Sequence, residues 1–210
     1  AAINSFQPSL NPGDMIILNN PFMGGTHLPD ITLVSPVFIS DNLIGFVANR
    51  AHHADVGGIT PGSMPIAREI FQEGLIIPPL KLIDAGNINH SVLDLIFANV
   101  RTPVERSGDL KAQIAANQRG TSRLQEIVNR YTSKDVASYM DKLLAYSERM
   151  TRSCLKNIPD GKYTFMDYLD DDGITQHPVP IQVSITITDD TALVDFSGSA
   201  PQQAGSINAV

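Results

Sequence analysis

The sequence predicts an α+β protein with a β-rich amino-terminal part carrying glycine-rich loops, a central long helical hairpin and carboxy-terminal antiparallel strands. Three observations favour this fold class. Short apolar runs rich in β-branched residues fill the first hundred positions, apolar residues then recur at helical spacing, and apolar and polar residues finally alternate. We therefore expect three parts, residues 1–100, 101–157 and 158–210. Their net charges, negative, positive and negative, agree with this division.

The β-rich part contains four apolar runs. Three are typical of strands, at residues 15–18, 31–39 and 43–48, and the segment Ser40-Asp41-Asn42 between the last two predicts a hairpin. The fourth run, residues 75–83, contains Pro78-Pro79. Because proline cannot donate a ladder hydrogen bond, we expect an edge strand or an extended segment there. The loops between the runs are rich in Gly and Pro, at residues 23–29, at 56–65 and around Gly74, and such loops often carry functional residues.

Residues 103–157 predict two long helices that form a hairpin. Thr132-Ser133 interrupts the helical pattern, Ser133 is a candidate N-cap of the second helix, and Gly120 is a weak point of the first. We expect the apolar stripe of the second helix to pack in the core and Cys154 to be a packed thiol rather than a nucleophile. The stripe positions are Leu110, Ile114, Leu124, Ile127, Val128 and Tyr131 on the first helix and Val136, Tyr139, Met140, Leu143, Leu144, Met150 and Cys154 on the second.

The last part returns to strands. Apolar residues alternate with polar ones over residues 181–188, Asp189-Asp190 turns the chain, and residues 193–196 follow as another strand. The acidic run of residues 170–173 lacks the alternate-residue spacing and closing Glu of a calcium loop, so we interpret it as a solvated turn.

Composition excludes several classes of protein. With 42% hydrophobic and 18% charged residues, the chain has enough apolar side chain for a core, which excludes intrinsic disorder. No apolar stretch is long enough to cross a bilayer, no secretory signal opens the chain, and one cysteine excludes a disulfide framework, so we expect a cytoplasmic protein. The basic residues of the middle part alternate with acidic ones and aromatic residues are scarce, so we expect neither a nucleic-acid nor a membrane partner.

Two loop motifs combine histidine, carboxylate and glycine. The first is Gly24-Gly25-Thr26-His27-Leu28-Pro29-Asp30, and the second is Arg50-Ala51-His52-His53-Ala54-Asp55-Val56-Gly57-Gly58. Nitrogen and oxygen ligands from two segments, without cysteine, are typical of a catalytic site for Mn²⁺, Zn²⁺ or Fe²⁺. The same residues could equally be core histidines bonded to neighbouring carboxylates.

The expected direction of each side chain divides the residues of the second motif into two groups. If its backbone is extended, His52 and His53 point to opposite sides and do not hold one ion together. His53 and Asp55 then share a face, where they could act in proton transfer or ligation. A Ser-His-Asp triad using Ser63 is an alternative, although Pro61-Gly62-Ser63-Met64-Pro65 lacks a nucleophile elbow. No phosphate-loop or dinucleotide fingerprint is present, so any ATP site is expected elsewhere.

Both motifs resemble signatures of the hydantoinase B family, which includes N-methylhydantoinase B, the carboxy-terminal part of 5-oxoprolinase and the acetone carboxylase α subunit. The first signature corresponds to residues 19–30 and the second to residues 50–65. Further blocks of similarity are Gln72-Glu73-Gly74, Asn99-Val100-Arg101, residues 108–113 and residues 195–201. Since members of this family are much longer, and the chain starts without Met and stops abruptly, we expect a fragment of a larger protein.

The resemblance implies a two-component, ATP-dependent enzyme. An A-type ATPase partner binds ATP and activates a small-molecule substrate, and the B-type component completes the reaction within a hetero-oligomer. At the positions of this sequence that match the family motifs, the resemblance implies His27, Asp30 and His52 as ligands of a divalent metal. It implies that His53 and Asp55 lie behind these ligands or act as general acid and base. The choice between Asp30 and Asp55 as the carboxylate ligand stays open. Gly57, Gly58 and Gly62 would let backbone N–H groups approach an oxyanion or phosphate.

Three functions are therefore considered. The first is the B-type component of an ATP-dependent cyclic-amide hydrolase that opens hydantoin, N-methylhydantoin or 5-oxoproline rings. The second is the α subunit of an ATP-dependent carboxylase of acetone or acetophenone type. The third is a non-catalytic module that docks the ATPase partner. On its own, the fragment is expected to be inactive.

Overall fold

A computed structural model describes residues 2–6, 8–62 and 65–208. The chain divides into two compact units, the first with its described residues up to Arg130 and the second comprising Tyr131–Asn208. The mixed α and β composition confirms the predicted fold class. The predicted division into three parts assigns both long helices to one region, whereas the first helix belongs almost wholly to the first unit and the second helix to the second unit.

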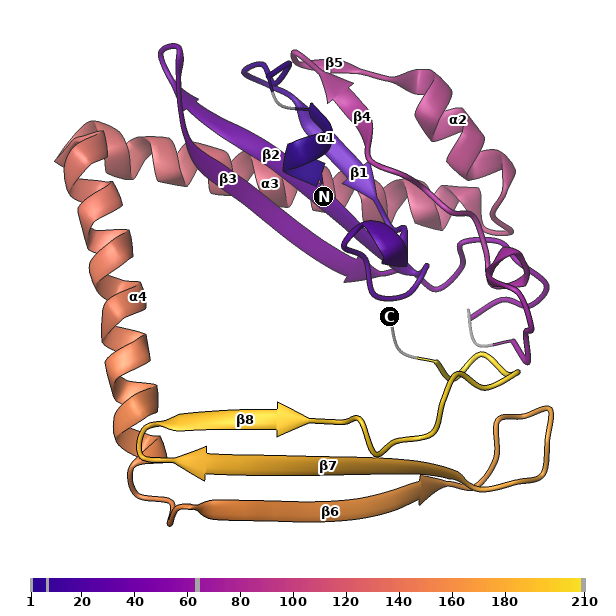
Figure 1. Cartoon of the computed structure of the whole chain (residues 1–210). Coiled ribbons are helices and arrows are strands. Elements are labelled where there is room, and N and C mark those ends of the chain that lie inside the picture. Colours follow the sequence, from indigo (N-terminus) through magenta and orange to yellow (C-terminus); the bar gives the residue numbers. More distant parts are fainter. Residues whose placement is uncertain (1, 7, 63–64, 209–210) are drawn as a thin grey trace. The chain divides into compact units, whose positions relative to one another are not determined.

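The first unit is built on a five-stranded antiparallel sheet with the order β3-β2-β1-β4-β5 (Figure 1). Its strands are β1 (Met15–Leu18), β2 (Asp30–Ile39), β3 (Asn42–His52), β4 (Leu80–Asp84) and β5 (Asn87–Ile88). The predicted hairpin between β2 and β3 is confirmed, but β3 continues to His52 instead of ending near residue 48. The second histidine motif therefore begins on a strand and not in a loop.

The predicted edge strand at residues 75–83 is only partly right. Pro78-Pro79 lies before β4, which is an interior strand between β1 and β5, so no ladder hydrogen bond is lost to proline. The extended segment in front of it is held by Asn19, whose side-chain oxygen accepts from Ile77 N at 2.6 Å. The Ile77 carbonyl in turn accepts from Asn19 N at 3.0 Å.

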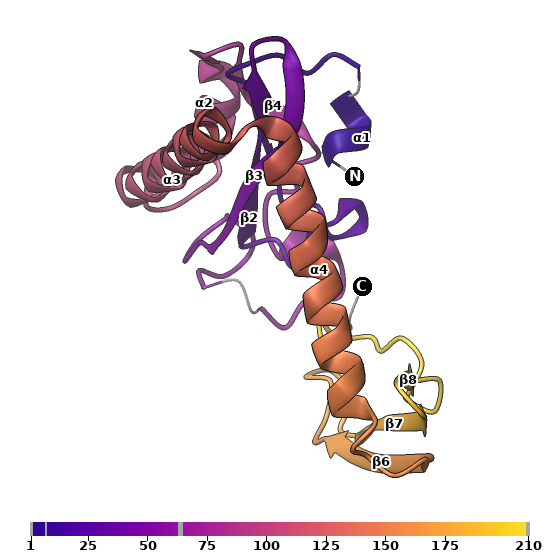
Figure 2. The same ribbon diagram turned by 90° about the vertical axis from the view of Figure 1, so that its left-hand side faces the viewer.

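Helices cover both faces of this sheet. Helices α2 (His90–Ala98) and α3 (Pro103–Tyr131) lie on one face and α1 (Ala2–Phe6) lies on the other (Figures 1 and 2). Successive residues of β1 face opposite sides of the sheet. Ile17 belongs to the core beneath α2 and α3, whereas Ile16 packs with residues of α1. Two short 3-10 turns, η1 (Pro21–Met23) and η2 (Ile70–Gln72), lie in the loops that carry the site.

The face of α3 toward the sheet is more polar than the sequence pattern predicts. Leu110 and Val128 are buried as expected, but Gln113 and Asn117 are also buried, while Ile127 and Tyr131 are exposed. The amide side chains make this possible by hydrogen-bonding to the strands: Asn117 Nδ2 donates to Ser35 Oγ at 3.1 Å, and Gln113 Nε2 donates to Ile31 O at 3.0 Å.

Gly120 has a packing role on α3. A Cβ at this position would lie 2.7 Å from Cγ1 of Val47 on β3, so the absence of a side chain lets the helix approach the strand closely. The predicted weak point of the helix is therefore a point of close contact with the sheet.

The second unit consists of α4 (Ser133–Leu155) and a three-stranded antiparallel sheet of β6 (Gly161–Leu169), β7 (Val179–Thr188) and β8 (Thr191–Asp195), with the order β6-β7-β8. The helix begins where the sequence predicts, but its N-cap is Thr132, one residue before Ser133. The Thr132 hydroxyl accepts from Asp135 N at 3.3 Å. The acidic run lies in the connection between β6 and β7 as predicted, but it is not wholly solvated, because Asp172 is buried.

The prediction that the α4 stripe packs in a core is wrong for the described residues. Leu144 is 71% exposed, and Tyr139, Met140, Leu143 and Met150 are also exposed, as is Cys154. The reason is that α4 meets its own sheet mainly near its carboxy-terminal end, where Arg152 pairs with Asp190.

Within the described residues, no helix is both long and apolar enough to cross a membrane.

Candidate metal centre

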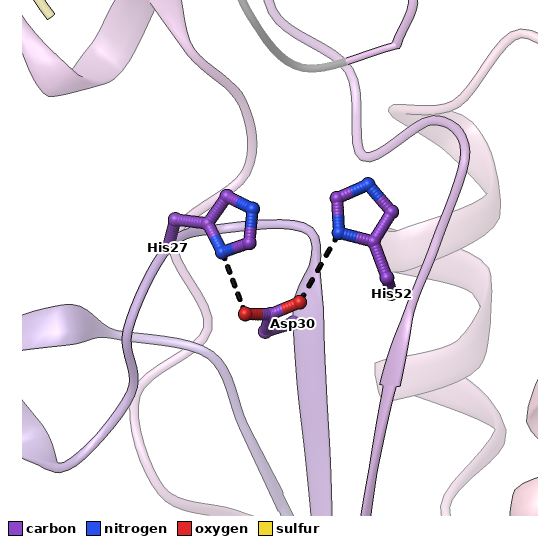
Figure 3. A group of neighbouring side chains, drawn as sticks. All are labelled: His27, Asp30 and His52. Atoms are coloured by element: carbon purple, nitrogen blue, oxygen red, sulfur yellow. Dashed lines mark hydrogen bonds and ion pairs between the residues drawn. The ribbon is translucent and has the colours of Figure 1, made fainter. Parts of the chain in front are cut away.

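The β2–β3 hairpin brings an aspartate and a histidine together at its open end. Asp30 is the first residue of β2, His52 is the last residue of β3, and the two are directly opposite in the register. Side chains of opposite residues on antiparallel strands lie on the same face. His52 Nδ1 accordingly lies 3.2 Å from Asp30 Oδ1 (Figure 3).

A tight turn before β2 adds a second histidine. Asp30 N donates to the carbonyl of His27 at 3.0 Å, and this turn places His27 Nδ1 2.6 Å from Asp30 Oδ2. The carboxylate of Asp30 thus lies between two imidazoles whose ring centroids are 5.1 Å apart (Figure 3). One potential ligand atom from each residue lies within 4.8 Å of the others.

Arg50 and Thr26 hold this loop in place. Arg50 donates from Nη2 to the Gly24 carbonyl at 3.0 Å and from Nη1 to Thr26 Oγ1 at 3.4 Å. The Thr26 hydroxyl donates to Asp30 Oδ2 at 2.7 Å. Both residues lie inside the two motifs, but the sequence pattern alone assigned them no role. The available signal was strand periodicity, because Arg50 shares a face of β3 with His52.

The electrostatics of the cluster favour an ionised Asp30. Burial acts to raise the pKa of this carboxyl group, but the Thr26 hydroxyl, the charge of His27 and the hydrogen bond from His52 outweigh it, so the pKa lies below its ordinary value. An ionised carboxylate is the form that binds a metal ion.

The donor set fits a divalent transition metal. Two imidazole nitrogens and one carboxylate oxygen make up the protein ligands of catalytic zinc sites and of iron sites with open positions. Ligand atoms within 4.8 Å of one another are close enough for one ion to be shared among them, since zinc sites hold such atoms at about 2.0–2.2 Å. The imidazoles are 40% and 53% exposed, so water and substrate can reach the position between them.

His53 points away from this cluster, as the extended backbone predicts. It is 2% exposed, and its Nε2 lies 2.8 Å from Gln113 Oε1 on α3. Burial lowers the pKa of His53 below its ordinary value, against the opposing effect of the Gln113 hydrogen bond. The structure therefore places His53 in the core between the sheet and α3.

Asp55 is tied to Arg101 and not to the two exposed imidazoles. Its Oδ2 accepts from Arg101 N at 2.5 Å, and its Oδ1 accepts from Arg101 Nη1 at 2.9 Å and from Gly57 N at 3.0 Å. Burial acts to raise its pKa, but these hydrogen bonds and the Arg101 charge lower it overall. Of the two candidate carboxylates, the structure places Asp30 beside His27 and His52.

The three glycines predicted to contact an oxyanion all have positive φ angles. Gly57 N already donates to Asp55, and Gly62 N donates to the Ala54 carbonyl at 3.0 Å. Gly57 and Gly58 also pack closely: a Cβ on either would lie within 2.6 Å of the backbone of Asn99 or Gln72. Their conformation and packing account for these glycines without a ligand. Ser63, the alternative nucleophile, lies outside the described residues.

Glu73 is a further charged residue that the sequence pattern did not select. It follows η2, and the charge of His27 acts on its carboxyl group, which indicates that it lies near the cluster. Burial raises its pKa above the ordinary value. Its place in the Gln72-Glu73-Gly74 block was the signal available from the sequence.

The comparisons with known proteins agree with these motifs. Residues 1–210 match the family described as Hydantoinase B/oxoprolinase. The B-type subunit of a putative D-/L-hydantoinase from Pseudomonas sp. is 40% identical over 200 residues, which are 92% of this chain and 34% of that protein.

Two solved structures share the fold. The crystal structure of the ATP-dependent caprolactamase from Pseudomonas jessenii matches with a TM-score of 0.85 and 32% identity over 92% of this chain and 34% of its own. Nucleotide-free acetone carboxylase matches with a TM-score of 0.87 and 21% identity over 97% of this chain and 29% of its own. The chain thus spans about a third of the length of each of these three proteins. It belongs to the hydantoinase B/oxoprolinase family.

Proposed function

We propose that this chain supplies the metal-holding part of the B-type component of an ATP-dependent cyclic-amide hydrolase. The observation that carries the proposal is the cluster of His27, Asp30 and His52, which joins both family motifs at one end of a hairpin. Its similarity to a putative hydantoinase component and to a caprolactamase supports the opening of a cyclic amide as the reaction. Hydantoin, N-methylhydantoin and 5-oxoproline are the ring types proposed.

In this proposal His27, Asp30 and His52 hold one divalent ion, Mn²⁺, Zn²⁺ or Fe²⁺, which when bound polarises a carbonyl or lowers the pKa of a water molecule. In the structure Asp30 is in hydrogen-bond contact with both imidazoles, and Thr26 and Arg50 fix the orientation of Asp30. His53 and Asp55 act behind the cluster as positioning residues. Both are buried, and His53 is hydrogen-bonded to α3 whereas Asp55 is hydrogen-bonded to Arg101.

The partner proposed is an A-type ATPase subunit or domain. An amide resists attack because its resonance would be lost, and phosphorylation of its oxygen by the partner would give a better electrophile. ATP is then bound by the partner and not by this chain, and the full-length protein acts as a hetero-oligomer.

Metal binding tests the cluster directly. In the full-length protein, His27→Ala and His52→Ala are expected to lower the affinity for Mn²⁺ or Zn²⁺ at least about 100-fold, since each removes a ligand. His90→Ala is the matched control, because His90 is exposed at the start of α2. Unchanged metal content in both ligand variants, by elemental analysis, would refute the site.

A second candidate is the α subunit of an ATP-dependent ketone carboxylase, favoured by the shared fold with acetone carboxylase. Assays of the reconstituted complex separate the candidates. Hydrolysis of ATP that depends on a hydantoin or 5-oxoproline supports the hydrolase, and hydrolysis that depends on a ketone with bicarbonate supports the carboxylase. If His52→Ala impairs assembly but leaves the turnover of assembled complex unchanged, the chain is instead a docking module.

A further inference from the structure

Gln113 of α3 is hydrogen-bonded next to both residues of the Asp30–His52 pair. Its Nε2 donates to the Ile31 carbonyl on β2 at 3.0 Å, and its Oε1 lies 2.8 Å from Nε2 of His53, directly after β3. Ile31 follows Asp30 in the sequence, and His53 follows His52. One side chain therefore contacts the neighbour of each of these two proposed ligands.

Gln113 reaches the hairpin from the face opposite to the ligands. Side chains alternate along a strand, so Asp30 and His52 project to one face of the hairpin, whereas the Ile31 side chain is buried on the other. Ile31 packs there in the core that includes Leu110 of α3. Gln113, which is only 6% exposed, can thus hold both strand ends without occupying the space in front of the ligand atoms.

The orientation of the Gln113 amide is fixed by its partners. A backbone carbonyl only accepts, so the Ile31 carbonyl requires Nε2 on its side, where Nε2 also donates to Asn49 Oδ1 at 2.7 Å. Asn49 Nδ2 donates in turn to the Gln113 carbonyl and to Asn117 Oδ1, both at 2.8 Å. Gln113 Oε1 therefore faces His53, whose Nε2 donates to it. An amide paired in this way has one orientation, and it fixes the positions of its partners.

The end of the hairpin depends on such support. Among the described residues, one backbone hydrogen bond continues the strand pairing past Asp30 and His52, from His53 N to the Pro29 carbonyl at 2.9 Å. In addition, β3 is an edge strand of its sheet. Strand ends with few partners open locally at low cost in free energy. Hydrogen bonds from Gln113 to the ends of both strands oppose this opening.

We propose that Gln113 is a positioning residue of the metal centre, which holds the ends of β2 and β3 together so that Asp30 and His52 stay side by side. It acts through Ile31 and His53, the neighbours of those two residues. The part of this inference that concerns the metal rests on the proposed function, whereas the joining of the two strand ends does not.

Metal affinity of the full-length protein tests the proposal. Gln113→Met keeps the length of the side chain and removes its hydrogen bonds. The matched control is Asn117→Leu, because Asn117 is also buried on α3 but bonds to Asn49 and Ser35. We expect the affinity for Mn²⁺ to fall about 10-fold in Gln113→Met, as for other groups behind metal ligands, and to stay unchanged in the control.

The EPR spectrum of bound Mn²⁺ provides a readout that a loss of stability alone would not move. We expect it to change in Gln113→Met, because the two ligands are no longer held in one arrangement, and to stay unchanged in Asn117→Leu. Equal affinities and identical spectra in the two variants would overturn the proposal.

Hydrogen exchange of the metal-free protein separates this inference from the proposed function. By mass spectrometry, peptides that cover the end of β3 should exchange at least about 10-fold faster in Gln113→Met than in Asn117→Leu, since the bonds that hold the strand ends are lost. Peptides of β1 provide the reference for global unfolding. Equal exchange in the two variants would overturn the inference. If the unmodified protein binds no Mn²⁺, the proposed metal site fails, and the exchange rates still decide whether Gln113 joins the two strands.

Discussion

At the scale of single residues, Thr26 determines the orientation of the Asp30 carboxylate. Its hydroxyl donates to Asp30 Oδ2 at 2.7 Å, and it is the link through which Arg50 reaches the carboxylate. Thr26→Val keeps the shape and removes this donor. Loss of such an outer partner typically costs a metal site about 10-fold to 100-fold in affinity, and we expect a loss in that range for Mn²⁺ or Zn²⁺. Titration calorimetry of the full-length protein measures it.

The control for Thr26→Val is Thr151→Val on α4, where the hydroxyl bonds only the local Ser147 carbonyl at 2.9 Å. Equal metal affinity in the two variants would show that Thr26 has no part in positioning Asp30.

A role of Asp55 in stabilising the fold and a role in the reaction lead to different experimental outcomes. Hydrogen bonds and the charge of Arg101 hold the pKa of Asp55 in the folded protein below its value in the unfolded chain. Ionised Asp55 therefore stabilises the fold fully at pH values above the unfolded pKa. This stabilisation is lost as the pH falls through the folded pKa. Asp55→Asn is expected to cost about 2 kcal/mol, below the usual cost of breaking a buried pair, because Arg101 is 43% exposed. Urea unfolding at pH 7 measures this loss, and metal content should stay unchanged. A variant that loses metal but keeps its stability would make Asp55 a ligand.

Part of the site could be predicted residue by residue. Strand alternation was enough to separate His52 from His53, and the family resemblance selected the three residues that the structure brings together, His27, Asp30 and His52. The partner of His53 could not be predicted, because Gln113 lies 60 positions away on a helix whose pattern indicated only an apolar face. Polar contacts between elements have no periodicity of their own in a single sequence.

At the scale of elements, Gly120 sets the contact between α3 and β3. Gly120→Ala would gain about 1 kcal/mol of helix propensity but force a methyl group against Val47, and such overpacking costs about 1–3 kcal/mol. We expect a net loss of about 1 kcal/mol in the free energy of unfolding, measured with urea.

Gly108 on the same helix provides the matched control, since a Cβ there meets no atom within 4 Å. Gly108→Ala should stabilise the protein by up to about 1 kcal/mol. In a Val47→Ala background, Gly120→Ala should become stabilising too. If it stays destabilising, the close approach to Val47 is not the cause.

The turn between β6 and β7 is organised by Asp172. Its carboxylate accepts from the backbone N–H groups of Thr175, Ile174 and Gly205 at 2.5–3.1 Å, and these bonds lower its pKa to about 2. A folded pKa below the unfolded value of 3.8 means that its stabilising effect is complete above about pH 4 and is lost as pH falls toward 2. Carbon NMR of the Asp172 carboxyl group should show a midpoint near 2, and a midpoint near 3.8 would mean that the turn is not held this way.

Pattern predicted several elements but missed α2 and β6, and it did not predict the environment of those it found. Alternation predicted β7, and helical spacing predicted α3 and α4 with the break at residue 132. The interior position of β4 was missed because a proline pair was assigned to the strand instead of to the segment before it. Such errors arise because neighbours in a sheet are set by the whole chain and not by the local sequence.

At the scale of the whole molecule, the second unit carries more apolar surface than a solvent-facing unit usually does. Besides the α4 stripe, Tyr163, Phe165 and Tyr168 on β6 are exposed. Patches of this kind typically mark surfaces that another polypeptide covers. The hydantoinase subunit and the caprolactamase that this chain matches are about three times as long. Periodicity therefore correctly found an apolar stripe on α4 but could not tell what it packs against.

Cys154 reports on this surface, because it is the single cysteine of the chain and its exposed side chain belongs to the α4 stripe. The sample is the chain of residues 1–210 without denaturant. We expect a maleimide to label one equivalent of thiol in it, at a rate within about 10-fold of the rate for a free cysteine peptide, because the rate depends on how accessible the thiolate is. The matched control carries Cys154→Ser with Val128→Cys, a position only 4% exposed on α3, and should label only after unfolding. If Cys154 is protected until denaturant is added, the stripe is covered, and protection that weakens on dilution would identify a second copy of the chain as the cover.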